Sequence, residues 1–99
     1  MRPHEVKTVR TEVLGLHQGD FARLIGVSRN TIVSWEKGRT PVPDLQAGII
    51  RQLEQEAKRR ENVEEWARGL LSLAVGGLFG LMLGKLFSND HKATHSDET

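Results

Sequence analysis

The chain has 99 residues, with 14 Lys and Arg against 13 Asp and Glu, and no cysteine. This length accommodates one small domain with an appendage rather than two full cores. The lack of cysteine excludes disulfides and thiolate metal sites, and the polar N-terminus is unlike a signal peptide, so we expect the first domain in the cytoplasm. Residues 1–43 carry seven Lys and Arg against four Asp and Glu, whereas residues 44–68 and 69–99 are each slightly acidic. The basic excess therefore falls where a phosphate-binding surface would need it.

Three helices are predicted in close succession in the first forty residues. Apolar residues at helical spacing predict the first over residues 5–14, and Gly15 is suited to end it. A second helix is expected over residues 18–25, with its apolar face formed by Phe21, Ala22 and Ile25. After a turn at residues 26–28, Ser28 is a good N-cap for a third helix over residues 29–37.

A fourth helix is predicted to follow Pro41 and Pro43, with Asp44 as its cap. Its repeat of Leu45, Ile49 and Leu53 should close the core over the apolar side chains of the preceding helices, namely Phe21, Ile25, Ile32 and Trp35. No Pro or Gly interrupts residues 49–68, and acidic-to-basic pairs recur there at i,i+4: Glu54–Lys58, Glu56–Arg60 and Glu64–Arg68. We therefore expect the helix to continue as an exposed, charged stalk over residues 56–68.

Two short helices across a tight turn are the arrangement that places a helix in the major groove of DNA. With Val27, Ile32 and Trp35 anchoring the third helix, its outward positions would meet base edges: Arg29, Asn30, Val33 and Ser34. Arginine can donate to guanine and asparagine can pair with adenine, while Thr31 or Val33 can touch a thymine methyl. Phosphates would be held by side chains flanking the two helices, and the DNA-binding set is completed by Gln18, Ser28, Lys37, Arg39 and Thr40.

The spacing of these residues resembles that of a known family. The pattern Gln18-x-x-Phe21-Ala22-x-x-Ile25-Gly26-Val27-Ser28-x-x-Thr31-Ile32-x-x-Trp35-Glu36-x-Gly38-x-x-x-x-Pro43 is similar to the Xre-type helix-turn-helix family of phage repressors and Cro proteins, and to antitoxins built on the same domain. The resemblance covers about residues 5–55. It implies a lambda-repressor-like domain of four or five helices that binds palindromic operators, usually as a dimer. It assigns DNA contacts to Gln18, Arg29, Asn30, Ser34 and Arg39.

One departure from the family concerns a buried ion pair. Many members pair an arginine, four residues before the position of Gly15, with a glutamate at the position of Glu36. Here that residue is Thr11, and Arg10 stands one place earlier. The sequence leaves open whether Arg10 reaches Glu36.

An uncharged run from Gly69 to Gly84, with five glycines, forms the second distinctive feature. Extended to residues 66–87 it would measure about 33 Å as a helix, close to the roughly 30 Å of a bilayer core. More basic residues precede this segment than follow it, which predicts that its N-terminal side is cytoplasmic. A stripe of small residues repeats every fourth position and would let two such helices pack closely: Ser72, Gly76, Gly80 and Gly84.

The sequence thus predicts an all-α chain: a helix-turn-helix domain (1–55), a charged helical stalk (56–68), a hydrophobic transmembrane helix (66–87) and a disordered tail (88–99). The expected function is sequence-specific DNA binding by a regulator, as a homodimer or higher homo-oligomer on double-stranded DNA, anchored in the cytoplasmic membrane. Two alternatives stay open. One is a soluble repressor or antitoxin whose apolar helix binds a second copy or a protein partner, and the other is a membrane scaffold that uses the fold for protein contacts. We expect no enzymatic activity and no cofactor or metal, because no catalytic constellation or phosphate loop is present.

Overall fold

The computed structural model describes residues 1–73, in which five α-helices and one π turn are joined by short connections. The elements are α1 (Pro3–Thr8), η1 (Val9–Val13), α2 (Gln18–Ile25), α3 (Arg29–Glu36), α4 (Asp44–Ala57) and α5 (Val63–Leu73). No strand occurs among these residues, so the all-α prediction is confirmed for this part of the chain.

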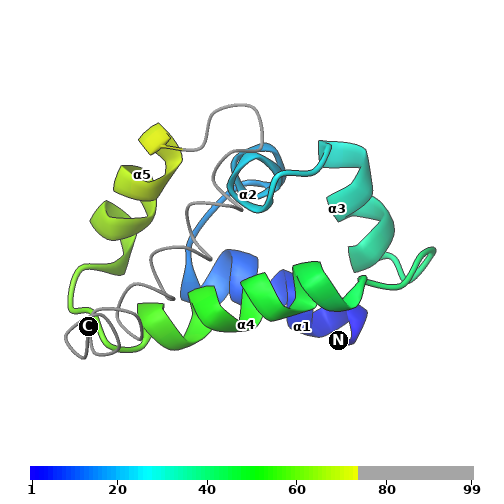
Figure 1. Cartoon of the computed structure of the whole chain (residues 1–99), viewed down its shortest axis with the longest axis horizontal. Coiled ribbons are helices and arrows are strands. Elements are labelled where there is room, and N and C mark those ends of the chain that lie inside the picture. The colour runs from blue at the N-terminus through cyan, green and yellow to red at the C-terminus, as the bar shows by residue number, and fades with distance from the viewer. Residues whose placement is uncertain (74–99) are drawn as a thin grey trace, which may run out of the picture.

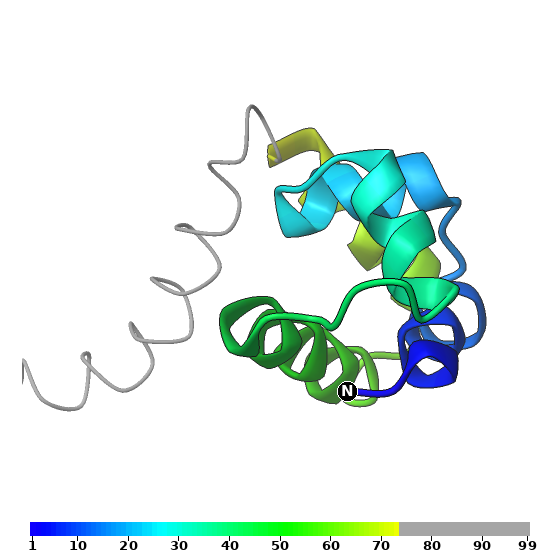
Figure 2. The ribbon, with the colours of Figure 1, turned by 90° about the vertical axis from the view of Figure 1, so that its right-hand side faces the viewer.

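The helices enclose one apolar core. The α2 and α3 helices cross on one side of it, whereas α4 and α1 lie on the other, and α3 and α5 flank α2 from opposite sides (Figures 1 and 2). Each helix from α1 to α4 contributes to the largest fully buried side chains, which are Val6, Leu14, Phe21, Leu24, Ile32, Ile50 and Leu53. Because α5 stands on the far side of α2, it leaves the outer face of α3 uncovered.

The first helix changes its geometry halfway. It begins at Pro3, where the missing N–H of proline costs nothing, and its last turn is π-helical, with the Leu14 amide donating to the Val9 carbonyl over 2.9 Å. A π turn accommodates one more residue than an α turn. The departure noted at Thr11 is accounted for by this extra residue. In a helix without it, the side chain at position 11 would take the place that Arg10 takes here.

The predicted helix-turn-helix is confirmed with little change. The α2 helix has the expected bounds, and α3 ends one residue early, at Glu36. Gly26 closes α2 with a φ of 86° and its amide donates to the Ala22 carbonyl at 2.8 Å. A side chain at this left-handed position would be strained, so glycine is the residue that makes the turn this tight.

Two predictions for the fourth helix are wrong. Pro43, rather than Asp44, is the N-cap. Leu45, expected in the core, is 71% exposed, whereas Leu53 is fully buried and Ile49 is half-buried against the core, as expected. The buried face consists of Ile50, Leu53 and Ala57. The sequence of this helix carries two overlapping apolar stripes, and the one that includes the small Ala57 is fully buried, while Leu45 at the start of the other is exposed.

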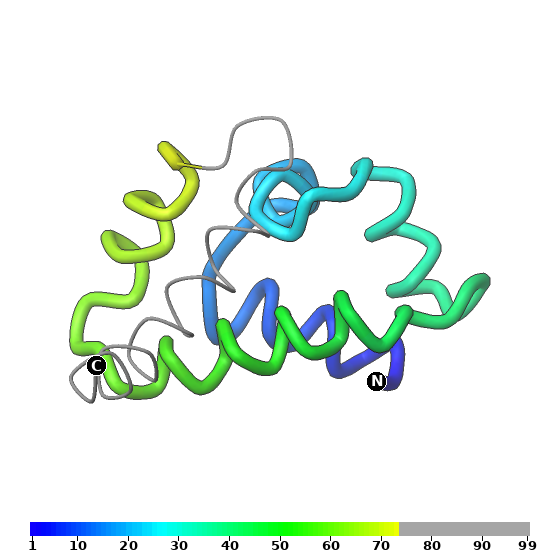
Figure 3. Tube along the Cα trace, viewed as in Figure 1, coloured from blue at the N-terminus to red at the C-terminus, as the bar shows by residue number. Residues whose placement is uncertain are grey.

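The continuous stalk expected over residues 56–68 is also corrected. The α4 helix ends at Ala57, residues 58–62 turn, and α5 runs back against α2 (Figure 3). Asn62 caps the new helix. The backbone amide of Glu65 donates to the side-chain oxygen of Asn62 at 3.2 Å, and the side-chain nitrogen of Asn62 donates to the Glu65 carboxylate. The three predicted i,i+4 ion pairs do form, at distances of 3.2 to 3.7 Å.

The helix expected over residues 66–87 begins inside the domain. Ala67 is fully buried and Leu70 is 9% exposed, so both belong to the core. The guanidinium of Arg60 lies over the ring of Trp66, 4.6 Å from its centre. Within residues 1–73, no helix is both long enough and apolar enough to cross a membrane. Residues 74–87 and the tail of residues 88–99 lie outside the described part.

Candidate nucleic-acid interface

The third helix is fixed at its start by its own cap. The Ser28 hydroxyl accepts a hydrogen bond from the Thr31 amide at 3.1 Å and lies 2.9 Å from the Thr31 hydroxyl. Both side chains are therefore engaged within the first turn of α3. This cap orients the helix, because it holds the residues on either side of the turn in one geometry.

The two faces of α3 differ sharply. Ile32 is fully buried and Trp35 is 3% exposed, so this face is anchored in the core. Arg29 and Asn30 are exposed at the N-terminal end of the helix, whereas Val33 and Ser34 are half-buried one turn later. The structure thus presents a guanidinium and an amide, the two groups best able to recognise guanine and adenine edges, on a rigid support.

Further polar side chains surround this helix. Lys37, Arg39 and Thr40 are exposed in the segment that follows α3. Gly38, with a φ of 72°, ends the helix and turns the chain there. Two exposed cationic side chains beside the end of this helix have the chemistry for phosphate contacts, the kind of contact that sets register on DNA.

Gln18 has a second role that the sequence did not reveal. It is half-buried at the start of α2, and its side-chain amide donates to the Glu36 carboxylate at 3.2 Å. The bond joins the first residue of α2 to the last residue of α3. Gln18 therefore fixes the position of the two helices relative to each other.

Arg10 completes this network from the first helix. Its guanidinium donates to both oxygens of Glu36, at 2.6 and 3.0 Å, and to the Leu16 carbonyl at 3.0 Å. The side chains of Arg10 and Glu36 are only 10% and 6% exposed. The question left open by the sequence is answered: Arg10 does reach Glu36. A bidentate pair of this kind gives geometric precision as well as attraction.

The ionisation of Glu36 reflects this environment. Burial alone would raise the pKa of Glu36, but the hydrogen bonds donated by Arg10 and Gln18, with the nearby charge of Lys7, lower it below the ordinary value of 4.5. Glu36 is thus held as a carboxylate by its donors. Every buried side-chain nitrogen and oxygen in residues 1–73 has a hydrogen-bond partner.

The predicted oligomerisation residues are not brought together in the described part. Ser72 is exposed near the end of α5, where its hydroxyl donates to the Gly69 carbonyl at 2.8 Å. Gly76, Gly80 and Gly84 lie outside the described residues. The stripe that they were expected to form stays a prediction.

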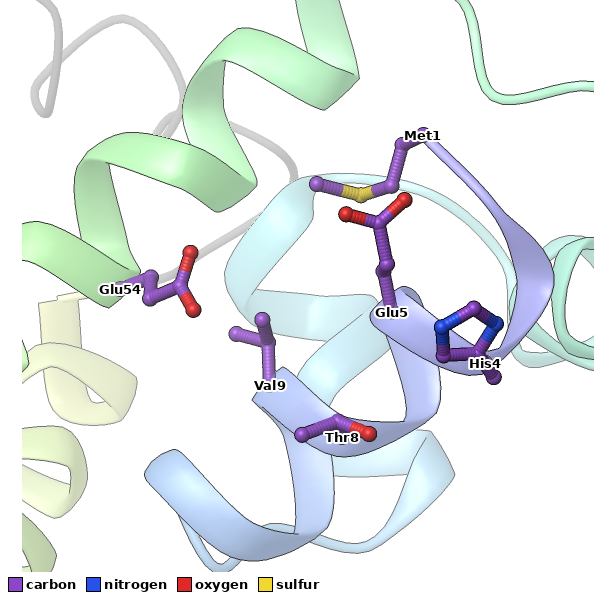
Figure 4. A pocket seen from close by; sticks show the side chains of 6 residues that line it. All are labelled: Met1, His4, Glu5, Thr8, Val9 and Glu54. Atoms are coloured by element: carbon purple, nitrogen blue, oxygen red, sulfur yellow. The ribbon is translucent and has the colours of Figure 1, made fainter.

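A small hollow on the opposite side of the domain lies between α1 and α4 (Figure 4). Its volume is about 200 Å³, and it is lined by Met1, His4, Glu5, Thr8, Val9 and Glu54. The Arg2 amide, which donates to Glu5 at 2.7 Å, is the main cause that lowers the pKa of that carboxyl. With carboxylates in its wall, this hollow is unsuited to the phosphate backbone of DNA.

Comparison with known proteins agrees with the geometry of α2 and α3. The model of the family described as helix-turn-helix matches residues 6–46, which include both helices, the turn and the segment after α3. No curated protein and no solved structure matches the chain. The hydrophobic run beyond α5 is not part of the family match.

Proposed function

We propose that this chain, whose residues 6–46 match the model of the helix-turn-helix family, is a regulator that reads DNA sequence through α3. The observation that carries the proposal is the contrast within α3: Ile32 and Trp35 are buried while Arg29 and Asn30 are exposed. We further propose that the chain acts by binding rather than by catalysis. Its targets would be two-fold symmetric operators in double-stranded DNA.

This function is tested by selecting duplexes from a random pool with the full chain and measuring binding to the enriched sequence. We expect binding that weakens linearly with the logarithm of salt concentration, with a slope of about −0.9 per neutralised phosphate. Arg68→Ala is a control for the loss of one positive charge. It removes an exposed cation from α5, on the other side of α2 from α3, and should leave binding unchanged. If no sequence is enriched and no duplex is bound at low salt, the domain serves protein contacts instead.

The C-terminal run supports a second, separate proposal: the chain is anchored in the cytoplasmic membrane. Its support is the uncharged sequence from Gly69 to Gly84. The packing of α5 sets a condition, since Ala67 and Leu70 are buried in the domain. If α5 stays in place, residues 74–87 could extend only about 21 Å as a helix, short of the roughly 30 Å of a bilayer core. A membrane span must therefore take residues from α5.

A soluble repressor or antitoxin, the alternative, leaves α5 packed. Fractionation without detergent separates the two. An anchored chain should pellet with membranes and be released only by detergent, whereas a chain truncated after Leu73 should stay in the supernatant and still bind DNA. A full-length chain found in the supernatant would contradict anchoring. Truncation after Glu61 is a poor choice, because it would remove Ala67 and Leu70 from the core.

A further inference from the structure

An apolar side chain stands exposed at the start of α4. Leu45 is 71% exposed, the largest value among the exposed large hydrophobic residues of the described part. On the same side of the helix follow Gly48 and Gln52, which are exposed, and Ile49, which is half-buried against the core, at spacings of three, seven and four residues. These four residues, called here the α4 stripe, carry no charge.

Gly48 is unusual within this stripe. It lies in the middle of a 14-residue helix, it is exposed, and a Cβ placed on it would meet nothing within 4 Å. Relative to alanine, glycine costs a helix interior up to about 1 kcal/mol. The domain itself thus has no steric need for this glycine. A partner packed closely at this point would require a glycine, because only glycine lets another backbone approach so near.

The charges beside the stripe have a matching arrangement. Asp44 and Arg51 are seven residues apart, which is about 20° short of two full turns, so they lie along the same flank. Both are exposed, and neither forms an ion pair among the described residues, although the charge of Arg51 contributes to the lowered pKa of Glu5. The midpoint between them falls beside Gly48.

We propose that the α4 stripe is the contact surface between two copies of this chain. If two α4 helices cross antiparallel about a two-fold axis beside Gly48, Asp44 of each copy faces Arg51 of the other. A symmetric contact requires such self-complementarity, with opposite charges at equal distances on either side of the axis. The Leu45 side chains would cover the apolar part of the partner stripe. DNA is a poor occupant, because Asp44 would repel its phosphates.

This surface would also suit the proposed function, although the inference does not depend on it. The α4 helix begins directly after the segment that leaves α3 (Figures 1 and 3), so pairing through its first turns would relate the two recognition helices by the same two-fold axis. The tests below contain no DNA, so a failure of DNA binding leaves them intact.

Cysteine capture tests the proximity of the two stripes. The full chain has no cysteine, so Gly48→Cys introduces a single thiol. We expect mild oxidation to link most of this variant into a disulfide dimer. Gly19→Cys is the matched control, because Gly19 is also a helical glycine with nothing within 4 Å of an added Cβ, and it should stay largely monomeric on a reducing-agent-free gel. Equal linking of the two variants, or none at Gly48→Cys, would overturn the proposal.

Charge reversal tests the pairing itself. In sedimentation equilibrium of the full chain, Asp44→Arg and Arg51→Asp should each weaken self-association about tenfold or more, because two symmetric contacts become repulsive. The double variant should restore it, since its charges are again complementary. Asp44 and Arg51 are both exposed, and circular dichroism checks that the helices persist. Association that is unchanged in both single variants would place the contact elsewhere, for instance in residues 69–87, and would refute the inference.

Discussion

Replacing Arg10 with alanine should lower the free energy of unfolding by about 3 kcal/mol, because it leaves the Glu36 carboxylate buried without its partner. The Leu16 carbonyl and the Gln18 amide would lose part of the same network. For a domain of this size the midpoint of thermal unfolding should fall by about 15 °C. Denaturant titration followed by tryptophan fluorescence, which reports on Trp35 and Trp66, measures the loss.

Arg23→Ala is the matched control for this prediction. Arg23 pairs with Asp20 at 3.7 Å, but its side chain is 59% exposed, so the loss should stay below about 1 kcal/mol. A similar small effect at Arg10 would show that the buried network does not hold the helices together. Arg10→Lys should be intermediate, because lysine keeps the charge but not the two-pronged geometry.

The same network sets a dependence on pH. The pKa of Glu36 is lower in the folded chain than its ordinary value of 4.5, so the stabilisation is fully present above pH 4.5 and is lost as pH falls through the folded pKa. The pKa of Glu5 is also lowered in the folded chain, so Glu5 changes the stability with pH in the same direction. The difference in free energy of unfolding between the wild-type chain and Glu36→Gln isolates the contribution of Glu36. This difference should shrink in acid.

Replacing Arg29 with alanine should weaken binding to the enriched duplex by about 10- to 100-fold, the equivalent of one lost bidentate base contact. The loss should be confined to sequences that carry the preferred base at one position. The physical reason is that Arg29 is exposed on a helix whose other face is fixed by Ile32 and Trp35. Titration of the preferred duplex and its single-base variants measures the change.

Arg39→Ala provides the contrast for Arg29. Its side chain follows α3 and is proposed to hold a phosphate, so its loss should weaken all duplexes alike and reduce the salt slope by about 1. If Arg29→Ala behaves in the same way, α3 does not read bases through this residue. Both residues are exposed, so neither change should affect folding.

Local signals made the helix-turn-helix predictable. Gly26 and Ser28 fix the turn through a positive φ and a side-chain cap, and these effects act within a few residues of the chain. The outward position of Arg29 and Asn30 then follows from the burial of Ile32 and Trp35, which share the opposite face. The contact between Gln18 and Glu36 could not be predicted in this way, because it depends on how α2 and α3 cross.

The remaining errors arose where packing decides between local alternatives. The sequence of α4 has apolar residues on two overlapping faces, and Leu45 belongs to the one that is exposed. No proline or glycine marks the end of α4 at Ala57, so the charged run after it was predicted to continue the helix. The pair of Asn62 and Glu65 was a usable signal for a new helix start, since a side-chain acceptor followed three residues later by glutamate is a capping pattern.

The position of α5 has a mechanical consequence. Any tension applied to the chain beyond residue 73 passes first through α5, which is attached through apolar contacts of Ala67, Leu70 and the partly buried Trp66. Those contacts would shear before the bonds that join Arg10, Gln18 and Glu36. Under load, α5 would therefore detach first and leave the packing of α2 and α3 intact.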